Sequence, residues 1–146
     1  MYHAQMADYS DMPIAEFGFP GSLRDQLVTV IRDGTKTSTT SMLIEYTIGS
    51  EALPEVGERQ VVIDSDGKPT AVIEITEVKH ARLSDVDLQH ARDEGEGFES
   101  VDEWRLGHEE YWHGNGMRAY VGDPEFVVTD STELLLQRFR LVRLLP

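Results

Sequence analysis

Hydrophobic residues at helical spacing predict one helix near the start of the chain. Four aliphatic side chains fall on one face of it: Leu23, Leu27, Val30 and Ile31. Ser22 and Asp25 resemble a capping box at its start, and Gly34 is typical of the residue at which such a helix ends. The pattern therefore predicts a helix of about three turns between Gly21 and Gly34.

The second half of the chain contains two further helical patterns. Ser84 is expected to cap a short helix that runs to about Ala91, and Gly95 and Gly97 end it in a tight acidic loop. A longer helix follows Ser100, which repeats the capping-box pattern with a glutamate three residues later. Four ring side chains share a face of this helix before a Gly-Asn-Gly run breaks it: Trp104, His108, Tyr111 and Trp112.

Runs of β-branched and aromatic residues predict strands between the helices. One run, residues 39–47, comes directly after the first helix. Residues 60–63 and 71–78 are joined through Asp64-Ser65-Asp66-Gly67, which is a hairpin signal. Residues 132–145 fit a helix or a strand, and the alternation of hydrophobic residues with arginines favours a final strand.

The order of these elements predicts an α+β fold. The strands lie too close together in the chain for helical crossovers, so the sheet should be mainly antiparallel, either open or closed into a small barrel. Residues 1–16 are polar, carry three methionines and show no periodicity, and we interpret them as an N-terminal arm. Residues 17–146 then form a single domain with one hydrophobic core.

The charge of the chain excludes one class of function. Its 146 residues include 13 Lys and Arg against 27 Asp and Glu, which gives a formal charge of −14. Such a charge repels polyphosphate at long range, so tight non-specific nucleic-acid binding is not expected. A short oligonucleotide or a single nucleoside is still permitted, because local contacts decide binding at close range.

Two absences from the sequence limit the chemistry further. There is no cysteine, which excludes disulfides, thiolate nucleophiles and cysteine-bound zinc and agrees with a reducing compartment. No stretch approaches the ~18 apolar residues of a membrane span, and the first residues do not resemble a signal peptide. We therefore expect a cytoplasmic protein with no membrane contact.

The segment Gly34-Thr35-Lys36-Thr37-Ser38-Thr39 is where we expect the chemistry to lie. It places one lysine and four hydroxyls in the turn between the first helix and the first strand, where side chains can converge. A lysine partly removed from water binds its proton less tightly, so it can act as a base toward a hydroxyl or as a donor toward an oxyanion. The alternative is that the threonines simply begin a strand and that Lys36 is solvated.

Three other groups of residues have competing interpretations. The run at residues 108–113 resembles a zinc-binding helix, but its histidines are five residues apart and do not share a face, so no metal site is predicted. Trp104, Tyr111 and Trp112 form either a base-stacking surface or part of the core. Asp93-Glu94-Gly95-Glu96 is either a catalytic loop or a solvated acidic turn.

Several short motifs occur in the order typical of one known family. Gly34-x-Lys36-x-x-Thr39 follows a short helix that starts after Phe17-Gly18-Phe19-Pro20-Gly21. His90-Ala91-Arg92-Asp93-Glu94-Gly95 and Glu103-Trp104-Arg105 come later in the chain. Together these stretches resemble the ASCH family, over roughly residues 17–143. The resemblance implies a PUA-like fold, a small β-barrel flanked by helices, and an association with RNA or RNA-derived nucleosides.

One bacterial branch of that family hydrolyses the amide of N4-acetylcytidine with a lysine, a threonine and a glutamate. The resemblance places these catalytic roles on Lys36, Thr39 and Glu94. It implies that Thr39 attacks the acyl carbon, that Lys36 takes its proton or lowers its pKa, and that Glu94 holds the lysine or protonates the leaving amine. Neither a metal nor a cofactor is implied. We expect further substrate-binding residues at seven positions: Gly34, Thr35, Thr37, Ser38, Tyr46, Arg138 and Arg140.

The expected partner is a nucleoside or a short single-stranded RNA, and two other functions stay open. One is a non-enzymatic RNA-binding module in which the lysine contacts phosphate, together with Arg138 and Arg140 if these share a strand face. The other is a ribonuclease, which resembles a branch that uses lysine, tyrosine and serine. Val30 stands where that tyrosine is expected, so Tyr46 would have to substitute for it in space, and Ser131 is the candidate for the serine.

Overall fold

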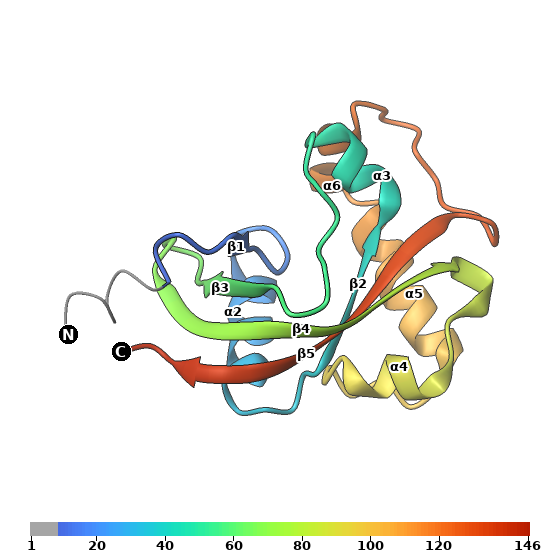
Figure 1. Cartoon of the computed structure of the whole chain (residues 1–146). Coiled ribbons are helices and arrows are strands. Elements are labelled where there is room, and N and C mark those ends of the chain that lie inside the picture. Colours follow the sequence, from blue (N-terminus) through green and yellow to red (C-terminus); the bar gives the residue numbers. More distant parts are fainter. Residues whose placement is uncertain (1–8) are drawn as a thin grey trace.

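The computed structural model describes residues 9–146. Within them, five strands form one sheet: β1 (Ile14–Ala15), β2 (Ser38–Met42), β3 (Arg59–Ile63), β4 (Pro69–Arg82) and β5 (Glu133–Leu144). Five α-helices and one short 3₁₀ helix complete this part of the chain: α2 (Ser22–Arg32), α3 (Leu43–Ile48), α4 (Leu88–Asp93), α5 (Val101–Trp112), α6 (Asn115–Val121) and η1 (Leu83–Asp85). In Figure 1, α2 lies behind the left half of the sheet, and α4 and α5 lie at its right end.

The strands follow the order β1-β3-β4-β5-β2 across the sheet. β1 pairs with β3 in parallel, and the other pairs are antiparallel, as an α+β chain predicts. Among the described residues, β1 and β2 form the two edges and do not pair with each other, so the predicted closed barrel is wrong. Closure requires edge strands long enough to pair, whereas β1 has 2 residues and β2 has 5 before the chain turns into α3.

The two longest strands, β4 and β5, carry the sheet past two separate groups of helices. Their pairing runs over almost their whole length and is interrupted by register shifts, one of which lies between Ile75 and Glu77. Such bulges increase the local bend and twist of a strand. Both strands curve visibly across the molecule as a result (Figure 1).

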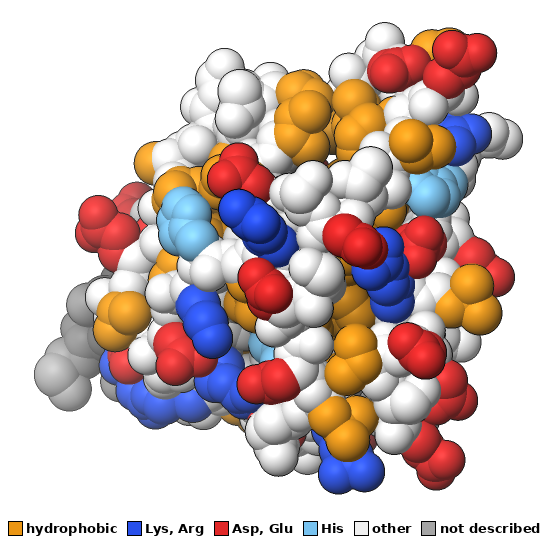
Figure 2. Space-filling view, turned by 90° about the vertical axis from the view of Figure 1, so that its right-hand side faces the viewer, with side chains coloured by type: hydrophobic (Ala, Val, Ile, Leu, Met, Phe, Trp, Pro, Cys, Tyr) orange, Lys and Arg blue, Asp and Glu red, His pale blue; other side chains and the backbone are white. Residues whose placement is uncertain are grey.

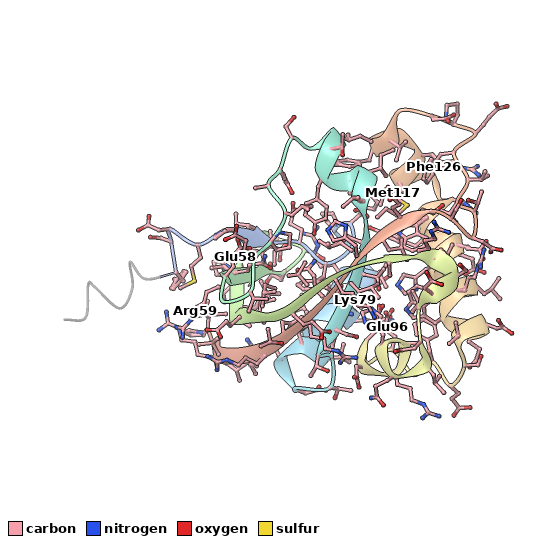
Figure 3. The ribbon with its side chains drawn as sticks, turned by 45° about the vertical axis from the view of Figure 1, so that its right-hand side comes forward. Glu58, Arg59, Lys79, Glu96, Met117 and Phe126 are labelled. Carbon is pink, nitrogen blue, oxygen red and sulfur yellow. The ribbon has the colours of Figure 1, made fainter. Side chains whose placement is uncertain are left out.

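Two large hydrophobic clusters, and a small one of Val61, Val72 and Leu145, lie along this bent sheet. The first packs α2 against the central strands, and its most buried members are Ile31, Val62, Ala71, Ile73 and Ile75. The second packs the later helices against the other end of the sheet, and its most buried members are Met42, Leu83, Ala91, Trp104, Trp112, Met117 and Leu134. Figure 3 shows Met117 and the partly buried Phe126 at that end.

The face that lies on the right in Figure 1 mixes basic and acidic side chains. Figure 2 views this face directly and shows Lys and Arg beside Asp and Glu. Arg105 pairs with Glu109 at 3.0 Å and with Asp130 at 2.7 Å, and Arg138 pairs with Asp93 at 2.6 Å. Carboxylates therefore neutralise these guanidinium groups locally.

Several predicted elements are confirmed. The first helix is α2, although its N-cap is Gly21 without a side-chain hydrogen bond. The predicted hairpin is β3–β4, and the ambiguous C-terminal segment is the strand β5. α5 begins as predicted, with the Ser100 hydroxyl accepting a hydrogen bond from the amide of Glu103 at 3.1 Å.

The strand predicted over residues 39–47 is shorter than expected. β2 ends at Met42, and the chain continues as α3. The carboxylate of Glu45 accepts a hydrogen bond from the Met42 amide at 2.7 Å, which caps the first turn of α3. The β-branched composition of this run therefore gave the wrong element, because a local side-chain cap outweighs strand propensity.

Two helix starts also differ from the prediction. Ser84 lies in η1, and α4 begins at Leu88 instead, because the Asp87 side chain accepts a hydrogen bond from the His90 amide at 2.8 Å. The Gly-Asn-Gly run ends α5 as predicted, but it also starts α6 at Asn115.

The predicted N-terminal arm overlaps the sheet. Residues 1–8 lie outside the described residues. Within the rest of residues 1–16, Ile14 pairs with Val61 and Ala15 with Val62, which places the end of this segment in β1. In the part of the chain that the structure describes, none of the helices has the length and apolar character needed to cross a membrane.

Candidate functional site

Lys36 is buried at the junction between α2 and β2. Its side chain is 2 % exposed, and its ammonium group donates to the carbonyl oxygens of Ser38 at 2.9 Å and of Glu94 at 3.3 Å. The same Nζ lies 3.7 Å from Oε1 of the Glu94 carboxylate. An ammonium group has three N–H donors and no acceptor, so these three oxygens match a charged lysine.

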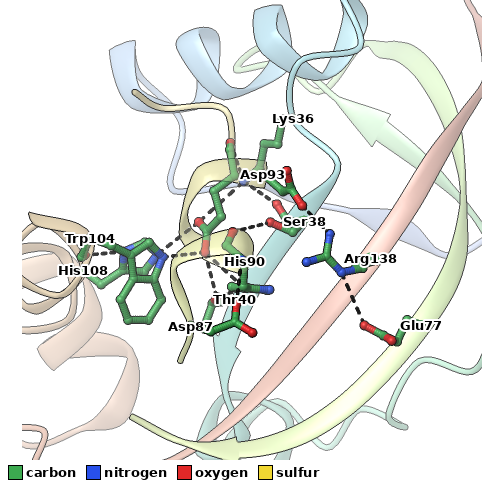
Figure 4. Close-up of polar contacts among 11 residues, drawn as sticks. Lys36, Ser38, Thr40, Glu77, Asp87, His90, Asp93, Trp104, His108 and Arg138 are labelled. Atoms are coloured by element: carbon green, nitrogen blue, oxygen red, sulfur yellow. Dashed lines mark hydrogen bonds and ion pairs between the residues drawn. The ribbon is translucent and has the colours of Figure 1, made fainter. Parts of the chain in front are cut away.

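Glu94 follows α4 directly and is equally buried, at 2 % exposure. Its Oε2 accepts hydrogen bonds from Thr40 Oγ1 and Trp104 Nε1, both at 2.7 Å, and its Oε1 lies 3.2 Å from Nε2 of His108 (Figure 4). Burial alone would raise the pKa of Glu94, but the charge of Lys36 and the hydrogen bonds from the histidines hold that pKa well below its usual value. Glu94 is therefore a fixed carboxylate.

His108 lies between two acceptors. Its Nδ1 is 2.9 Å from the carbonyl oxygen of Trp104, and its Nε2 faces Glu94. Both ring nitrogens must then carry hydrogen, which describes an imidazolium ion. Burial would lower the pKa of His108, but the hydrogen bond and charge of Glu94 raise it above the usual value. The ring also stacks on Trp104, with ring centroids 4.2 Å apart.

Hydroxyl groups of β2 tie this strand to α4. Thr40 donates its only hydroxyl hydrogen to Glu94, so the Nε2 of His90, 2.8 Å from the same oxygen, must be the donor in that contact. Ser38 donates to the carbonyl oxygen of His90 at 2.8 Å. The amide of Thr37 donates to the carbonyl oxygen of Asp93 at 2.8 Å. These bonds fix Lys36 and Glu94 relative to each other.

Gly95 makes a close approach that no other residue type would permit without movement. Its φ is +74°, and a Cβ at this position would lie 2.9 Å from both the backbone nitrogen and the Cα of Lys36. The loop after α4 therefore rests directly on the backbone at Lys36. This contact also brings the next residue, Glu96, to the same site.

A cavity of about 1210 Å³ opens beside the buried pair. Lys36, Thr39 and Glu94 all line it. Aromatic rings form much of its remaining wall: Phe17, Phe19, Tyr46, Phe98, Tyr111 and Tyr120. Phe19 and Tyr111 stack on each other with centroids 5.6 Å apart, and burial raises the pKa of Tyr111 to about 12, so this phenol stays neutral.

The charged groups that line the cavity are mostly acidic: Glu16, Glu45, Glu51, Glu58, Glu94 and Glu96. Its basic residues are Arg24, Lys36 and His108, and all three have hydrogen-bonding or ion-pair partners. Arg24 donates to the carbonyl oxygen of Gly18 at 2.6 Å and pairs with Glu16 at 3.3 Å. The cavity therefore presents a negative environment, apart from the fixed charges of Lys36 and His108.

One group of side chains has the composition of a metal site. The candidate ligand atoms of Glu94, Glu96 and His108 all lie within 4.8 Å of one another. However, both oxygens of Glu94 already accept hydrogen bonds, the Lys36 ammonium lies beside them, and His108 directs an N–H rather than a lone pair toward the carboxylate. The donor set is thus satisfied by its own hydrogen bonds, and we assign no cation to it.

Comparison with known proteins identifies the family. The model of the ASCH domain matches residues 14–143, which is most of the chain. The chain belongs to the ASCH domain family. Proteins of this family are generally associated with RNA. A search of curated proteins gave no match.

Solved structures of other ASCH proteins share the fold. Protein EF3133 from Enterococcus faecalis V583 is 24 % identical with a TM-score of 0.80, over 98 % of this chain and 86 % of that one. An ASCH domain from Lactobacillus crispatus JV V101 is 27 % identical with a TM-score of 0.77, over 95 % and 84 %. ASCH from Zymomonas mobilis is 13 % identical with a TM-score of 0.51, over 83 % and 67 %. The PUA-like type of fold is therefore shown, as an open sheet in this ASCH domain.

The structure brings part of the predicted ASCH site together. Lys36 and Glu94 form a buried ion pair, although they are far apart in the sequence. Thr39 lines the same cavity but makes no hydrogen bond with Lys36 in the described structure; it lies opposite Gln137 in β5. Tyr46 also lines the cavity and accepts a hydrogen bond from Gln137 at 3.2 Å.

The other predicted substrate-binding residues lie outside the cavity wall: Gly34, Thr35, Thr37, Ser38, Arg138 and Arg140. Gly34 and Thr35 are exposed in the turn after α2. Arg138 pairs with Asp93, and Arg140 pairs with Glu74 at 3.2 Å. Ser131, the serine considered for a ribonuclease, is exposed and lies outside the wall as well.

Four residues contact Glu94 that were not predicted to do so: Thr40, His90, Trp104 and His108. Their sequence positions carried a partial signal. His90 precedes Glu94 by four residues, and His108 follows Trp104 by four, so each pair meets on one side of a helical turn. Thr40 carried no such signal, because adjacent hydroxyls on a strand cannot be distinguished without knowing which face is buried.

Replacing Gly95 with alanine should lower the free energy of unfolding by more than backbone strain alone. A left-handed alanine costs about 1–3 kcal/mol, and the added Cβ would also meet the backbone of Lys36. Gly97→Ala is the matched control, because Gly97 has φ +86° with nothing within 4 Å of the added Cβ. Urea unfolding measures both variants, and equal losses would contradict the close approach.

Glu94→Gln should destabilise the protein by about 3–5 kcal/mol at pH 7, because it leaves the buried charges of Lys36 and His108 without a carboxylate. The folded pKa of Glu94 is lowered, so its stabilisation is fully present above the usual value of 4.5 and is lost as the pH falls through the folded value. Urea unfolding across this pH range measures the effect. Glu99→Gln is the control on an exposed carboxylate, and a loss that matched it would contradict the argument.

Proposed function

We propose that this chain hydrolyses the amide bond of an N4-acylated cytidine such as N4-acetylcytidine, without a metal. The observation that carries the proposal is the buried Lys36–Glu94 pair on the wall of a cavity that Thr39 also lines. A buried charge pair is costly to desolvate, so its place beside a cavity favours a role in chemistry.

The roles of the three residues follow from their surroundings. Thr39 Oγ attacks the acyl carbon, and negative charge develops on the carbonyl oxygen. Lys36 stays an ammonium ion and stabilises that charge electrostatically. Glu94 orients Lys36; because its pKa is held low, it does not supply the proton that the leaving amine needs.

The cavity supports a small neutral substrate. Its aromatic wall can stack on a pyrimidine ring, as such side chains do with unpaired bases. Its unpaired charges are carboxylates, which disfavour phosphate groups. A nucleoside or free base fits these conditions better than a nucleotide. In this proposal the predicted contacts of Gly34, Thr35, Thr37 and Ser38 are supporting ones, which hold the turn around Lys36.

An RNA-binding module is the second candidate, because the family is generally associated with RNA. It predicts affinity for a short single-stranded RNA that falls with salt, and no product. Tyr46 lines the cavity wall, which supports the ribonuclease alternative. Ser131 lies outside that wall, which argues against it. Fluorescence titration with a short RNA at two salt concentrations, followed by gel analysis of its length, separates all three functions.

The wild-type protein should convert N4-acetylcytidine to cytidine and acetate, as measured by chromatography. Lys36→Ala should abolish turnover, and Thr39→Val should do so while the fold is retained. Thr40→Val should reduce turnover less than Thr39→Val, because the Thr40 hydroxyl is engaged with Glu94 and His90 and is not the proposed nucleophile. Absence of turnover by wild type above the Lys36→Ala control would refute the proposal.

The 5′-monophosphate of N4-acetylcytidine should react with a kcat/KM about tenfold lower than the nucleoside, which corresponds to ~1.4 kcal/mol of repulsion. The difference should shrink at higher salt, because ions screen the exposed carboxylates. Glu51→Gln and Glu58→Gln should reduce the difference in kcat/KM between the two compounds. Glu125→Gln, whose side chain lies outside the cavity, should leave that difference unchanged. Steady-state kinetics measure kcat/KM for both compounds. Equal values at low salt would contradict the electrostatic argument.

A further inference from the structure

The proposed reaction needs a group that the Lys36–Glu94 pair does not provide. Attack by Thr39 releases a hydroxyl proton, and the departing N4 nitrogen must gain one. Lys36 donates to two carbonyl oxygens and lies 3.7 Å from the Glu94 carboxylate, so its amine is already engaged. Glu94 already accepts from Thr40 and Trp104 and faces His108. Some other side chain must therefore carry the proton.

Glu96 is placed to reach a molecule in the cavity. It lines the cavity wall and is exposed there, in the loop that Gly95 holds against Lys36. Figure 3 shows it beside α4. Its carboxylate lies within 4.8 Å of the ligand atoms of Glu94 and His108. Because the carboxylate of Glu96 is exposed to the cavity, it can exchange protons with a substrate there. The buried carboxylate of Glu94 stays ionised and does not release or take up a proton in this way.

Three other carboxylates of the wall have structural partners of their own, and Glu51 lies near Glu45, whose pKa its charge helps to raise. Glu45 caps α3 through the Met42 amide, Glu58 accepts a hydrogen bond from the side chain of Gln60 at 2.6 Å, and Glu16 pairs with Arg24. Among the described carboxylates of the cavity, Glu96 is the one that the loop places against the Lys36–Glu94 pair.

We propose that Glu96 is the general base and general acid of this site, and that it passes the proton of Thr39 to the leaving nitrogen of the substrate. The inference rests on the proposed function. The two adjacent glutamates then have separate tasks: Glu94 fixes the charge of Lys36, and Glu96 moves the proton.

The electrostatics of the pair support this division. Desolvation raises the pKa of Glu96 and the negative charge of Glu94 raises it further, whereas the positive charges of Lys36 and His108 oppose the rise. The pKa of Glu94 moves the opposite way. Two neighbouring carboxyl groups whose environments separate their pKa values in this way are typical of an acid–base site.

The proton balance closes over both halves of the reaction. As Thr39 Oγ bonds to the acyl carbon, its proton moves to the Glu96 carboxylate. The C–N bond then breaks, its electron pair stays on N4, and Glu96 returns the proton to that nitrogen to release cytidine. In the second half, a water molecule attacks the acyl-threonine, Glu96 takes one of its protons and gives it to Thr39 Oγ, and acetic acid leaves and loses its remaining proton to the solvent as acetate.

Glu96→Ala should lower the kcat for N4-acetylcytidine by at least about 10²-fold with little change in KM, since general acid–base groups contribute on this scale. Added formate should restore part of the rate, because a small carboxylate can occupy the vacated space. The wild-type rate should rise with pH through the pKa of Glu96, and Glu96→Gln should lose this rise. Glu99→Ala is the matched control, as an exposed glutamate outside the cavity.

The outcomes separate the two proposals. Turnover by wild type with an unchanged rate in Glu96→Ala would overturn the role of Glu96 and leave the proposed function standing. A slow Glu96→Ala that formate does not rescue, in a variant whose circular dichroism matches wild type, would show a merely structural role and would also overturn it. No turnover by wild type would overturn both.

Discussion

The burial of one lysine next to one glutamate constrains the rest of this structure. Removing both charges from water costs several kcal/mol per ion unless every hydrogen-bonding atom finds a partner. The chain supplies these partners from β2, from α4 and from α5, through Thr40, His90, Trp104 and His108. These hydrogen-bonded polar side chains are therefore part of the packing between the helices and the sheet.

The same pair links the two hydrophobic clusters. The Lys36 ammonium lies 6.0 Å from the ring centroid of Phe17, which belongs to the cluster around α2. Glu94 bonds to Trp104, which belongs to the cluster around α5. Lys36 and Glu94 lie between the two clusters, in a space that neither cluster fills alone. They are therefore almost inaccessible to solvent and still border the cavity.

The sequence correctly predicted the helices and turns whose signals lie within a few residues of each other. It did not predict features that depend on contacts between distant parts of the chain. The spacing of Leu27 and Ile31, the turn before β4 and the Ser100 cap each act within a few residues, and those elements are present. Closure of the sheet depends on whether two edges meet, which no local pattern reports. The family resemblance placed Lys36 with Glu94, whereas the strand alternation that turns Thr40 toward α4 required the structure.

The two sides of the cavity differ in how firmly the chain holds them. The side with Lys36, Glu94 and Gly95 is held by backbone contact and by hydrogen bonds among buried groups. The opposite side, at α3 and α6, is joined through the exposed hydroxyl of Tyr120, which donates to the carbonyl oxygen of Glu45 at 3.1 Å. Substitutions of the exposed members of that second side, such as Tyr120, can reshape the cavity at small cost to folding. Selection can therefore change what such a domain accepts while the buried pair stays the same.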